Sequence, residues 1–272
     1  MRLRRTTHTS QSSAVHQRRS VRAVLSALLI GSFALFATPV TAAAGAAAAL
    51  AGINFAPHST GAVHTGASGV KFATSSNWGG YAAISTTYTS VASTWVEPSA
   101  TCGSSTTYAS FWTGLDGYNS GSVEQTGTLV ECSGGSPHQF SWYEMYPASP
   151  VYFSNTMTAG DTMVSKVTAT SAGVFTLYLA DSTRGWSHTV TKTNSSLARS
   201  SAEVIAEAPS SSSGVLPLAN FGTVKFTSST VNGGTLGASG PTSITMASGS
   251  TTKASVSAIS GGTTFTMTWH HT

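Results

Sequence analysis

Two short segments of this chain carry side chains that could hydrolyse a bond with little other help. Residues 123–127 read Val-Glu-Gln-Thr-Gly, and residues 202–208 read Ala-Glu-Val-Ile-Ala-Glu-Ala. A glutamate carboxylate can take a proton from water, and a glutamine amide can donate a hydrogen bond to a developing oxyanion. The pair of segments therefore suggests water-based hydrolysis that needs no serine triad, metal ion or aspartate pair.

Other catalytic arrangements find no support in the sequence. The G-x-S-x-G turn of serine hydrolases does not occur, and no histidine lies in an H-E-x-x-H spacing. The main part of the chain has three aspartates, and Asp116 alone lies in a suggestive Asp-Gly turn. No glycine-rich phosphate loop precedes a helix. We therefore expect no metal site and no cofactor, and we take the glutamates as the candidate catalytic groups.

Strand alternation sorts these glutamates by face. Glu203 and Glu207 share one face of their segment, and the opposite face carries alanine and valine, which is typical of a packed core. We expect the glutamate face to meet water or a cleft. Trp142, Glu144 and Tyr146 also share a face, which could form a binding groove or an ordinary solvated strand face with aromatic cross-strand pairs. Alternation alone does not separate Glu203 from Glu207.

Strands must position these residues, because the chain shows no amphipathic helix. Short stretches with period-two alternation are separated by Gly, Ser, Asn and Asp, and Thr is frequent in them. The fold class expected is all-β, an antiparallel β-sandwich. The predicted strands are 77–83, 91–96, 109–113, 123–129, 140–146, 162–170, 175–179, 186–193, 203–208, 221–226, 255–259 and 265–269.

The beginning of the chain differs in charge from the rest. The first 22 residues hold six arginines and no acid, and an apolar run of about 15 residues follows and ends in a small-x-small pattern. The run is short of the roughly 20 residues that span a bilayer, so a signal peptide is favoured over an anchor. From Lys71 onward, seven basic residues stand against nine acidic ones, a net charge of −2. This excludes nucleic-acid binding based on basicity.

These features divide the chain into three parts. We predict a secretory signal peptide at 1–42, a flexible leader or short propeptide at 43–72 and one β-sandwich domain at 73–272. We expect a secreted, extracellular protein with no stable membrane association after signal removal. The loose twin-arginine pattern at 17–22 leaves the export route open.

Cys102 and Cys132 are the two cysteines of the chain. In an exported protein two cysteines usually pair, so we expect a disulfide between them. The alternative is two separate buried thiols.

Eight sequence blocks, in order, resemble those of the eqolisin family of glutamic peptidases. Each block is weak by itself, and together they cover most of the region from 75 to 226. The blocks are SNWGGY (76–81), WVEP (95–98), FWTGLDG (111–117), EQTG (124–127), WYEMYP (142–147), GD (160–161), AEVIAE (202–207) and ANFGTV (219–224).

The resemblance implies a sandwich of two large antiparallel sheets, a concanavalin-like jelly roll, and a catalytic pair of glutamine and glutamate. Gln125 falls on the glutamine of the family's Q-T-G motif, and Glu207 on the second acid of its A-E-x-I-x-E motif. The resemblance also implies that Trp112, Asp116 and Glu144 line or support the cleft. From the same aromatic block, Trp142 and Tyr143 are further expected substrate-binding residues.

The function expected is that of a secreted acid endopeptidase acting on proteins or peptides as a monomer. Few carboxylates also means few ion pairs to lose on protonation, which predicts weak acid unfolding. Two alternatives stay open: a β-sandwich glycosidase or carbohydrate-binding module, with Glu144 and Glu207 as the acid pair, or an inactive sandwich that binds peptides. Ala208-Pro209 after Glu207 departs from the pattern of the fungal family members, so the sequence does not predict the shape or the specificity of the cleft. The cysteines also depart from the fungal pattern.

Overall fold

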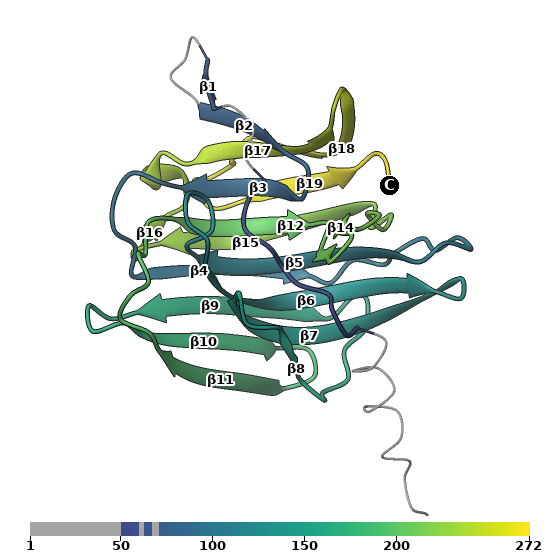
Figure 1. The fold of residues 1–272 in the computed structure, drawn as a ribbon, viewed down its shortest axis with the longest axis horizontal. Coiled ribbons are helices and arrows are strands. Elements are labelled where there is room, and N and C mark those ends of the chain that lie inside the picture. Colours follow the sequence, from purple (N-terminus) through teal and green to yellow (C-terminus); the bar gives the residue numbers. More distant parts are fainter. Residues whose placement is uncertain (1–49, 60–62, 67–70) are drawn as a thin grey trace, which may run out of the picture. The chain divides into compact units, whose positions relative to one another are not determined.

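The computed structural model of the chain describes residues 50–59, 63–66 and 71–272 (Figure 1). The predicted signal peptide at 1–42 lies outside the described residues, as does part of the predicted leader at 43–72. The described residues form 19 strands and one short 3-10 helix. In this part of the chain no helix is long and apolar enough to cross a membrane.

The strands lie in two layers, each with its own order of hydrogen-bonded neighbours. The first layer runs, in spatial order, β1 (His64–Thr65), β2 (Lys71–Ser75), β17 (Thr242–Ser248), β3 (Trp78–Ala83), β12 (Ala202–Glu207), β5 (Thr107–Leu115), β6 (Val123–Ser133), β7 (Ser136–Tyr146) and β8 (Val151–Tyr152). The second runs β18 (Thr251–Val256), β19 (Phe265–Trp269), β15 (Thr223–Val231), β4 (Ser90–Val96), β9 (Thr162–Ala169), β10 (Val174–Asp181) and β11 (Trp186–Thr193).

Three smaller pieces complete the fold. They are β16 (Gly234–Thr235), which pairs with the end of β15, the 3-10 helix η1 (Gly237–Ser239), and a two-strand ribbon of β13 (Ser210–Ser211) and β14 (Gly214–Val215). The two layers are continuous at one edge, where β17 of the first pairs with β18 of the second. Strand pairing is antiparallel throughout these elements except between β2 and β17.

The space between the two layers holds the larger hydrophobic core. Strands β5, β6 and β12 of the first layer pack against β4, β9 and β10 of the second. Ala202, Val204 and Ala206 enter this core, together with Phe111, Phe175 and other buried apolar side chains. The predicted antiparallel β-sandwich is thus confirmed, and the alanine and valine face of residues 202–208 is its packed side.

Most predicted strands occur, with ends moved by a few residues. Two have the predicted bounds, β11 and β19. The hairpin of β6 and β7 is longer than predicted, with 11 residues in each strand. Sequence reasoning missed β2 and β17, although β17 alternates, with Ile244 and Met246 buried between exposed or half-buried serine and threonine. Few charged residues flank β17, and Gly and Ser surround it, so it resembled a loop.

A second, smaller core lies on the outer face of the first layer. It contains Trp78, Trp112, Trp142 and Ile205 from the strands. Residues 50–59, drawn in dark purple in Figure 1, run across β12, β5 and β6 and add Leu50, Ile53 and Phe55 to the same cluster. This part of the predicted leader is therefore packed on the sheet that carries the candidate catalytic residues.

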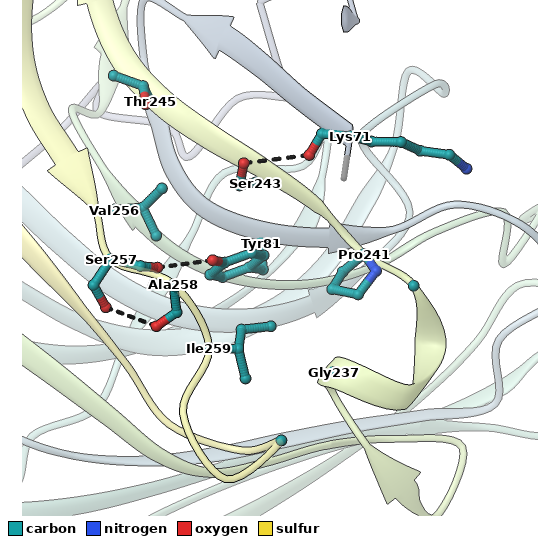
Figure 2. A pocket seen from close by; sticks show the side chains of 12 residues that line it. Lys71, Tyr81, Gly237, Pro241, Ser243, Thr245, Val256, Ser257, Ala258 and Ile259 are labelled. Carbon is teal, nitrogen blue, oxygen red and sulfur yellow. Dashed lines mark hydrogen bonds between the residues drawn. The ribbon is translucent and has the colours of Figure 1, made fainter. Parts of the chain in front are cut away.

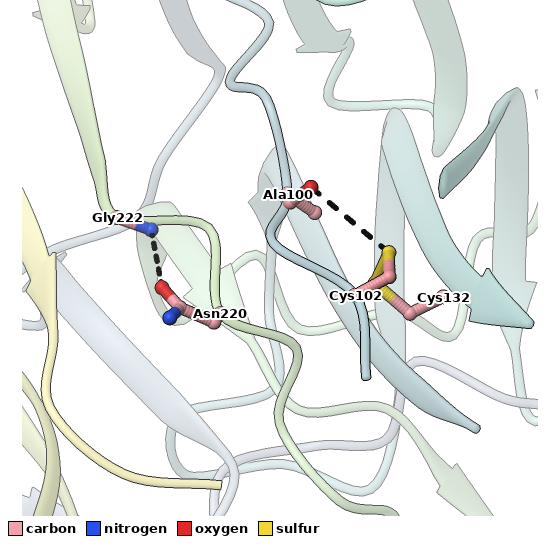
Figure 3. The surroundings of a disulfide bond; sticks show 5 residues. All are labelled: Ala100, Cys102, Cys132, Asn220 and Gly222. Atoms are coloured by element: carbon pink, nitrogen blue, oxygen red, sulfur yellow. Dashed lines mark hydrogen bonds between the residues drawn. A yellow bond between two sulfur atoms is a disulfide. The ribbon is translucent and has the colours of Figure 1, made fainter. Parts of the chain in front are cut away.

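The two cysteines form a disulfide, as predicted (Figure 3). Cys102 lies in the loop after β4, and Cys132 is buried near the end of β6, with 5.2 Å between their Cα atoms. The bond spans 30 residues and includes β5 in its loop. It therefore ties the β6–β7 hairpin, which carries the Q-T-G segment, to the segment that connects β4 of the second layer with β5 of the first.

Replacing both cysteines, Cys102→Ser with Cys132→Ser, is expected to lower the free energy of unfolding by about 3–4 kcal/mol. The open chain regains the entropy that closure of a 30-residue loop removes from the unfolded state. Urea unfolding followed by tryptophan fluorescence measures the difference. The unreplaced protein in reducing buffer is the control, and an unchanged midpoint in both samples would contradict the expectation.

Candidate active site

Neighbouring strands place the predicted glutamine beside a glutamate. In the register of the first layer, Gln125 of β6 lies opposite Gly114 of β5 on one side and Glu144 of β7 on the other. Glu203 of β12 continues the same row beyond Gly114. Directly paired residues on antiparallel strands point to the same face, so these side chains all face the outer side of the layer.

The amide group of Gln125 is held in one orientation by two acceptors. Its Nε2 donates to Glu144 Oε2 at 2.7 Å and to the backbone carbonyl oxygen of Phe55 at 2.6 Å. Its Oε1 is buried and has no hydrogen-bond partner among the described residues. Because a carboxyl oxygen accepts from the amide, Nε2 is fixed as the group that faces the peptide carbonyl.

Glu207 lies at the end of β12, next to Trp78 of β3 in the register. Its Oε2 accepts a hydrogen bond from the indole Nε1 of Trp112 at 2.8 Å. Its Oε1 is buried and without a partner in the described part of the chain. One carboxyl oxygen is thus anchored, and the other is free to bind water or substrate. No direct hydrogen bond joins Glu207 to Gln125.

The glycine of the Q-T-G segment makes room for this arrangement. Gly127 pairs with Trp112 on one side and Trp142 on the other, and a Cβ atom there would lie 2.1 Å from the Phe111 carbonyl oxygen. Thr126 faces the opposite way and donates its hydroxyl to the Trp142 carbonyl at 2.6 Å. The three residues of the motif therefore have different roles: Gln125 enters the site, Thr126 binds the backbone of β7, and Gly127 leaves room for its neighbours on β5.

Residues 50–59 lie over these groups and make backbone bonds with the site. Asn54 exchanges two backbone hydrogen bonds with Ser210, both of 2.9 Å. The Ala56 carbonyl accepts from Trp78 Nε1 at 3.0 Å and from Asn77 Nδ2 at 3.2 Å. A peptide in extended form is therefore bound across the strands that carry Gln125 and Glu207.

The Phe55 side chain enters the apolar part of the site. Its ring stacks on the Trp142 indole, with centroids 3.7 Å apart and planes 9° from parallel. The Phe55 backbone N–H lies 3.4 Å from Glu144 Oε1. Phe55 is completely buried. The carbonyl, the N–H and the side chain of Phe55 thus each meet a different group of the sheet, which are Gln125, Glu144 and Trp142 respectively.

Burial controls the charge of the carboxyl groups in the site. It raises the pKa of Glu144 to about 8, although the Phe55 N–H and the Gln125 amide act to lower it. It also raises the pKa of Glu207 well above its usual value, and the nearby Glu144 carboxyl adds to the rise. The donors of Trp112, Asn77 and Trp78 lower the Glu207 pKa in part. With residues 50–59 in place, both carboxyls are neutral in acid.

The remaining predicted site residues lie in different places. Asp116, at a positive φ of 67°, accepts hydrogen bonds from the backbone of Arg199 and Ser200, both at 2.7 Å, and so holds the chain where it enters β12. Tyr143 faces the opposite side of the layer from Trp142 and packs against Phe153. Asp116 thus supports the strand of Glu207 from a distance, and Tyr143 does not reach the cleft.

A second group of buried carboxyls lies near the start of β12. Glu124 and Glu203 are fully buried, and none of their carboxyl oxygens has a hydrogen-bond partner within the described residues. Burial and the neighbouring Asp116 raise the pKa of both, that of Glu124 to about 9. The glutamate face of β12 is therefore covered instead of facing water, because the strand lies in the middle of the layer under residues 50–59.

Sequence reasoning missed three residues of the site. Asn77 and Trp78 were part of a motif but had no assigned role, and both donate to the covering peptide. Phe55 lies in a segment of Ala, Gly and Ser. The sequence did contain a feature that could have pointed to Phe55, because Ile53 and Phe55 are among the few large apolar side chains of that segment.

One pocket lies elsewhere in the fold (Figure 2). It has a volume of about 660 Å³ and lies where β17 meets β18, bounded by Tyr81, Ser243 and Ile259. In it the Tyr81 hydroxyl donates to the Ser257 carbonyl at 2.7 Å. None of the predicted site residues lines this pocket. Within the described residues, no group of three or more His, Cys, Asp or Glu side chains is placed to hold a metal ion.

Comparison with known proteins identifies the family. The model of the peptidase A4 family matches residues 76–269. The chain belongs to this family. It is a glutamic endopeptidase with the β-sandwich fold of the eqolisins, which the sequence blocks had suggested. A comparison with curated proteins finds no match.

Solved structures of eqolisins are similar to this A4 peptidase over the whole sandwich. Scytalido-glutamic peptidase with a transition state analog inhibitor is 30% identical with a TM-score of 0.64, over 72% of this chain and 98% of that one. The eqolisin SCP-B in complex with the tripeptide Ala-Ile-His is 28% identical with a TM-score of 0.60, with the same coverage. Aspergilloglutamic peptidase from Aspergillus niger is 30% identical with a TM-score of 0.55, over 60% and 99%.

The buried carboxyls of this glutamic peptidase also set how its stability depends on pH. Burial raises the pKa of Glu97 to about 7, in addition to those of Glu124, Glu144, Glu203 and Glu207. The folded protein therefore binds protons that the unfolded chain, with ordinary glutamates near 4.5, releases. By linkage, the free energy of unfolding falls as the pH rises above 4.5.

One histidine works in the opposite direction. Burial against Tyr118 and Trp78 lowers the pKa of His58 to about 4, so its contribution is lost as the pH falls from 6.5 to 4. Asp161, whose pKa the Arg184 side chain helps to lower, loses its contribution only below its usual 3.8. Five carboxyls outweigh one histidine between pH 4.5 and 7.

We therefore expect the urea midpoint of unfolding to fall steadily from pH 4.5 to pH 7 at constant ionic strength. Glu97→Gln should reduce that slope. Glu97 Oε2 accepts both the Trp95 and Thr128 bonds while Oε1 has no partner within the described residues, so an amide fits without a titrating proton. A midpoint that rises toward pH 7, or a slope that Glu97→Gln leaves unchanged, would contradict this account.

Proposed function

We propose that this glutamic peptidase hydrolyses peptide bonds in acid with Glu207 as the general base and Gln125 as the oxyanion donor. The observation that carries the proposal is the hydrogen bond of Gln125 Nε2 to a peptide carbonyl, the Phe55 oxygen, at 2.6 Å. The chain's own peptide thus lies where a substrate carbonyl would meet the amide. Peptide substrates also agree with the inhibitor and tripeptide complexes of the related structures.

In the proposed reaction, Glu207 as a carboxylate takes a proton from water, and the resulting hydroxide adds to the carbonyl carbon. Negative charge develops on the carbonyl oxygen, and the Gln125 amide stabilises it. Glu207 then gives its proton to the leaving nitrogen as the C–N bond breaks. Trp112 holds one oxygen of Glu207 throughout, so the other faces the water. Glu144 holds the Gln125 amide in the donating orientation.

The proposed mechanism needs an ionised Glu207, and access of water supplies it. Desolvation is the main cause that raises its pKa while residues 50–59 cover the cleft. Once the cleft is open to water, that cause weakens and the pKa falls toward the ordinary value near 4.5. The carboxylate then forms at moderately acidic pH, which supports the proposed activity in acid.

The proposal extends to export. The basic and apolar start of the chain and the disulfide support a secreted protein that acts outside the cell, and we propose that it acts there as a monomer.

Glu207→Gln is expected to lower cleavage of denatured casein by about 10³-fold or more, and Gln125→Ala by about 10²–10³-fold, since one removes the base and the other the oxyanion donor. The assay runs from pH 2 to 7 with pepstatin present, which excludes contaminating aspartic peptidases. Glu203→Gln is the matched control: it lies on the same strand face and is buried, but it lies at the other end of β12, opposite Gly114. Full activity of Glu207→Gln, or equal losses for Glu203→Gln, would overturn the assignment.

Trp112→Phe tests whether the indole positions Glu207. Without the Nε1–H donor, the Glu207 pKa should rise, because that bond lowers it. The acid limb of the kcat/KM profile should then move to higher pH, together with a loss of activity. A purely structural role would lower activity at every pH and leave the limb in place.

A further inference from the structure

The acidic and basic side chains of this chain are divided unevenly between its interior and its surface. All nine aspartates and glutamates lie within the described residues, and each of them is 6% exposed or less. Four of the seven basic side chains from Lys71 onward are exposed, namely Lys166, Arg184, Lys192 and Lys225. Protein surfaces usually mix charges of both signs. The described surface therefore presents cations and no side-chain carboxylates.

Burial also changes the sign of the charge on the folded domain. The formal charge of −2 from Lys71 onward counts all nine acids as ionised. Burial raises the pKa of five of them, which are Glu97, Glu124, Glu144, Glu203 and Glu207. With these five neutral at pH 5, and the other four counted as ionised, seven basic side chains stand against four acids, a net charge of +3. The folded domain is therefore a cation in acid.

Two of the exposed lysines lie on the outer face of the second layer. Val167 of β9 and Val224 of β15 point into the core, so their neighbours Lys166 and Lys225 point away from it. The ion pairs among the described residues both belong to Arg184. Neither lysine of this face is therefore neutralised by a carboxylate of the described chain.

A hollow of about 350 Å³ lies beside Lys166 on this face. Three neighbouring strands line it, β9, β10 and β11, which lie side by side at the bottom of Figure 1. On the middle strand, Tyr178 pairs with Lys166 on one side and with Thr189 on the other, and Thr176 pairs with Thr168. The hollow thus presents one ammonium group, one phenol and three threonine hydroxyls, and none of its lining residues is acidic.

We propose that this face binds an acidic polysaccharide, a chain of sugars that carry carboxylates. Lys166 pairs with a carboxylate of the ligand, the Tyr178 ring packs on a sugar ring, and the threonine hydroxyls bond to sugar hydroxyls. Thr94 and Thr227 pair with each other between the hollow and Lys225, so the hydroxyl-bearing surface continues to the second lysine. The peptidase cleft lies on the other layer, so a bound polysaccharide leaves it free.

The spacing of the two lysines favours this ligand over a nucleic acid. Strand β4 lies between them, with Ala92 opposite Lys166 and Val96 level with Lys225. Two strand spacings and four residues along the strands put the two lysine Cα atoms about 16 Å apart. A nucleic acid duplex carries one charge per about 1.7 Å of its axis, so two lysines leave most of its phosphates unpaired. Separated cations with hydroxyls between them suit a chain whose charges alternate with hydroxyls.

The test measures binding of the full chain to polygalacturonate at pH 5 by isothermal titration calorimetry, with neutral dextran as the control polymer. Binding is expected for polygalacturonate and not for dextran, and it should weaken as the salt concentration rises. Lys166→Glu should lower the affinity by about tenfold, because it removes one ion pair and adds a repulsion. Tyr178→Ala, which removes the ring without a change of charge, should lower it by about fivefold.

Lys192→Glu is the matched control for the loss of positive charge. Lys192 is exposed like Lys166, but its ammonium lies over the Tyr143 ring, on the other face of β11. This variant should keep the affinity within about twofold of the unchanged protein. Because threonine is common on any exposed strand face, this comparison separates a binding face from an ordinary solvated one. The urea midpoint of each variant, followed by tryptophan fluorescence, shows that it is folded.

Each contrary outcome overturns a stated part of the proposal. Equal losses of affinity for Lys166→Glu and Lys192→Glu would overturn the face, since the net charge alone would then explain binding. Tighter binding to duplex DNA or to phosphatidylserine vesicles than to polygalacturonate would overturn the class of ligand. No binding to any of these polyanions would overturn the whole proposal. The measurement involves no cleavage, so its result does not depend on the roles proposed for Glu207 and Gln125.

Discussion

The hydrogen bond from the Trp112 indole to the Glu207 carboxyl is the contact on which the site depends. It joins β5 to β12 across the outer face of the first layer and leaves one oxygen of Glu207 free. Trp112 takes its position because Gly127, its neighbour on β6, has no side chain, and because Trp78 meets it edge to face at 4.9 Å. The packing of two indoles over a glycine thus orients a carboxyl, and a larger residue at 127 would move it.

Burial serves stability and function in opposite ways. In the folded chain, carboxyls such as Glu97 and Glu124 lie in or beside the core and have pKa values raised to about 7 and about 9, so folding favours the protonated form. A protein that works in acid gains from this, because protonation then accompanies folding. The reaction proposed for Glu207 needs the opposite, an ionised carboxyl at moderate acidity. In the proposed reaction the two demands are compatible, because residues 50–59 would leave the cleft over Glu207 while Glu97 and Glu124 would stay buried.

The parts of the fold that sequence could predict are those set by local pattern. Alternation gave β11 and β19 with their bounds and assigned the alanine face of residues 202–208 to the core. It could not separate Glu203 from Glu207, because the two differ in their surroundings and not in their face. Glu203 lies beside Gly114 and the buried Asp116 group, whereas Glu207 lies beside Trp78 at the strand end. That difference is one of tertiary contact.

Asp116 and Tyr143 show the same limit from another side. Asp116 was placed by its motif, but its bonds to the Arg199 and Ser200 backbone, which hold the entry to β12, depend on a loop more than 80 residues away. Tyr143 follows Trp142 in sequence, yet adjacent residues on a strand face opposite ways, and Tyr143 meets Phe153. Strand alternation would have excluded it from a face shared by Trp142 and Glu144.

The way in which residues 50–59 are bound over the site distinguishes a cleft for peptides from a cleft for sugars. An aromatic ring beside a carboxyl, as in Trp142 and Glu144, suits either ligand when only the sequence is known. The groups that bind residues 50–59 are spaced for a peptide backbone: Gln125 and Trp78 each donate to a successive carbonyl, and Ser210 exchanges an N–H and a carbonyl with the cover. A sugar ring offers hydroxyls and no such repeat of donors and acceptors. The backbone match therefore favours peptides for a reason that is independent of the family, and it does so with the same atoms that the reaction would use.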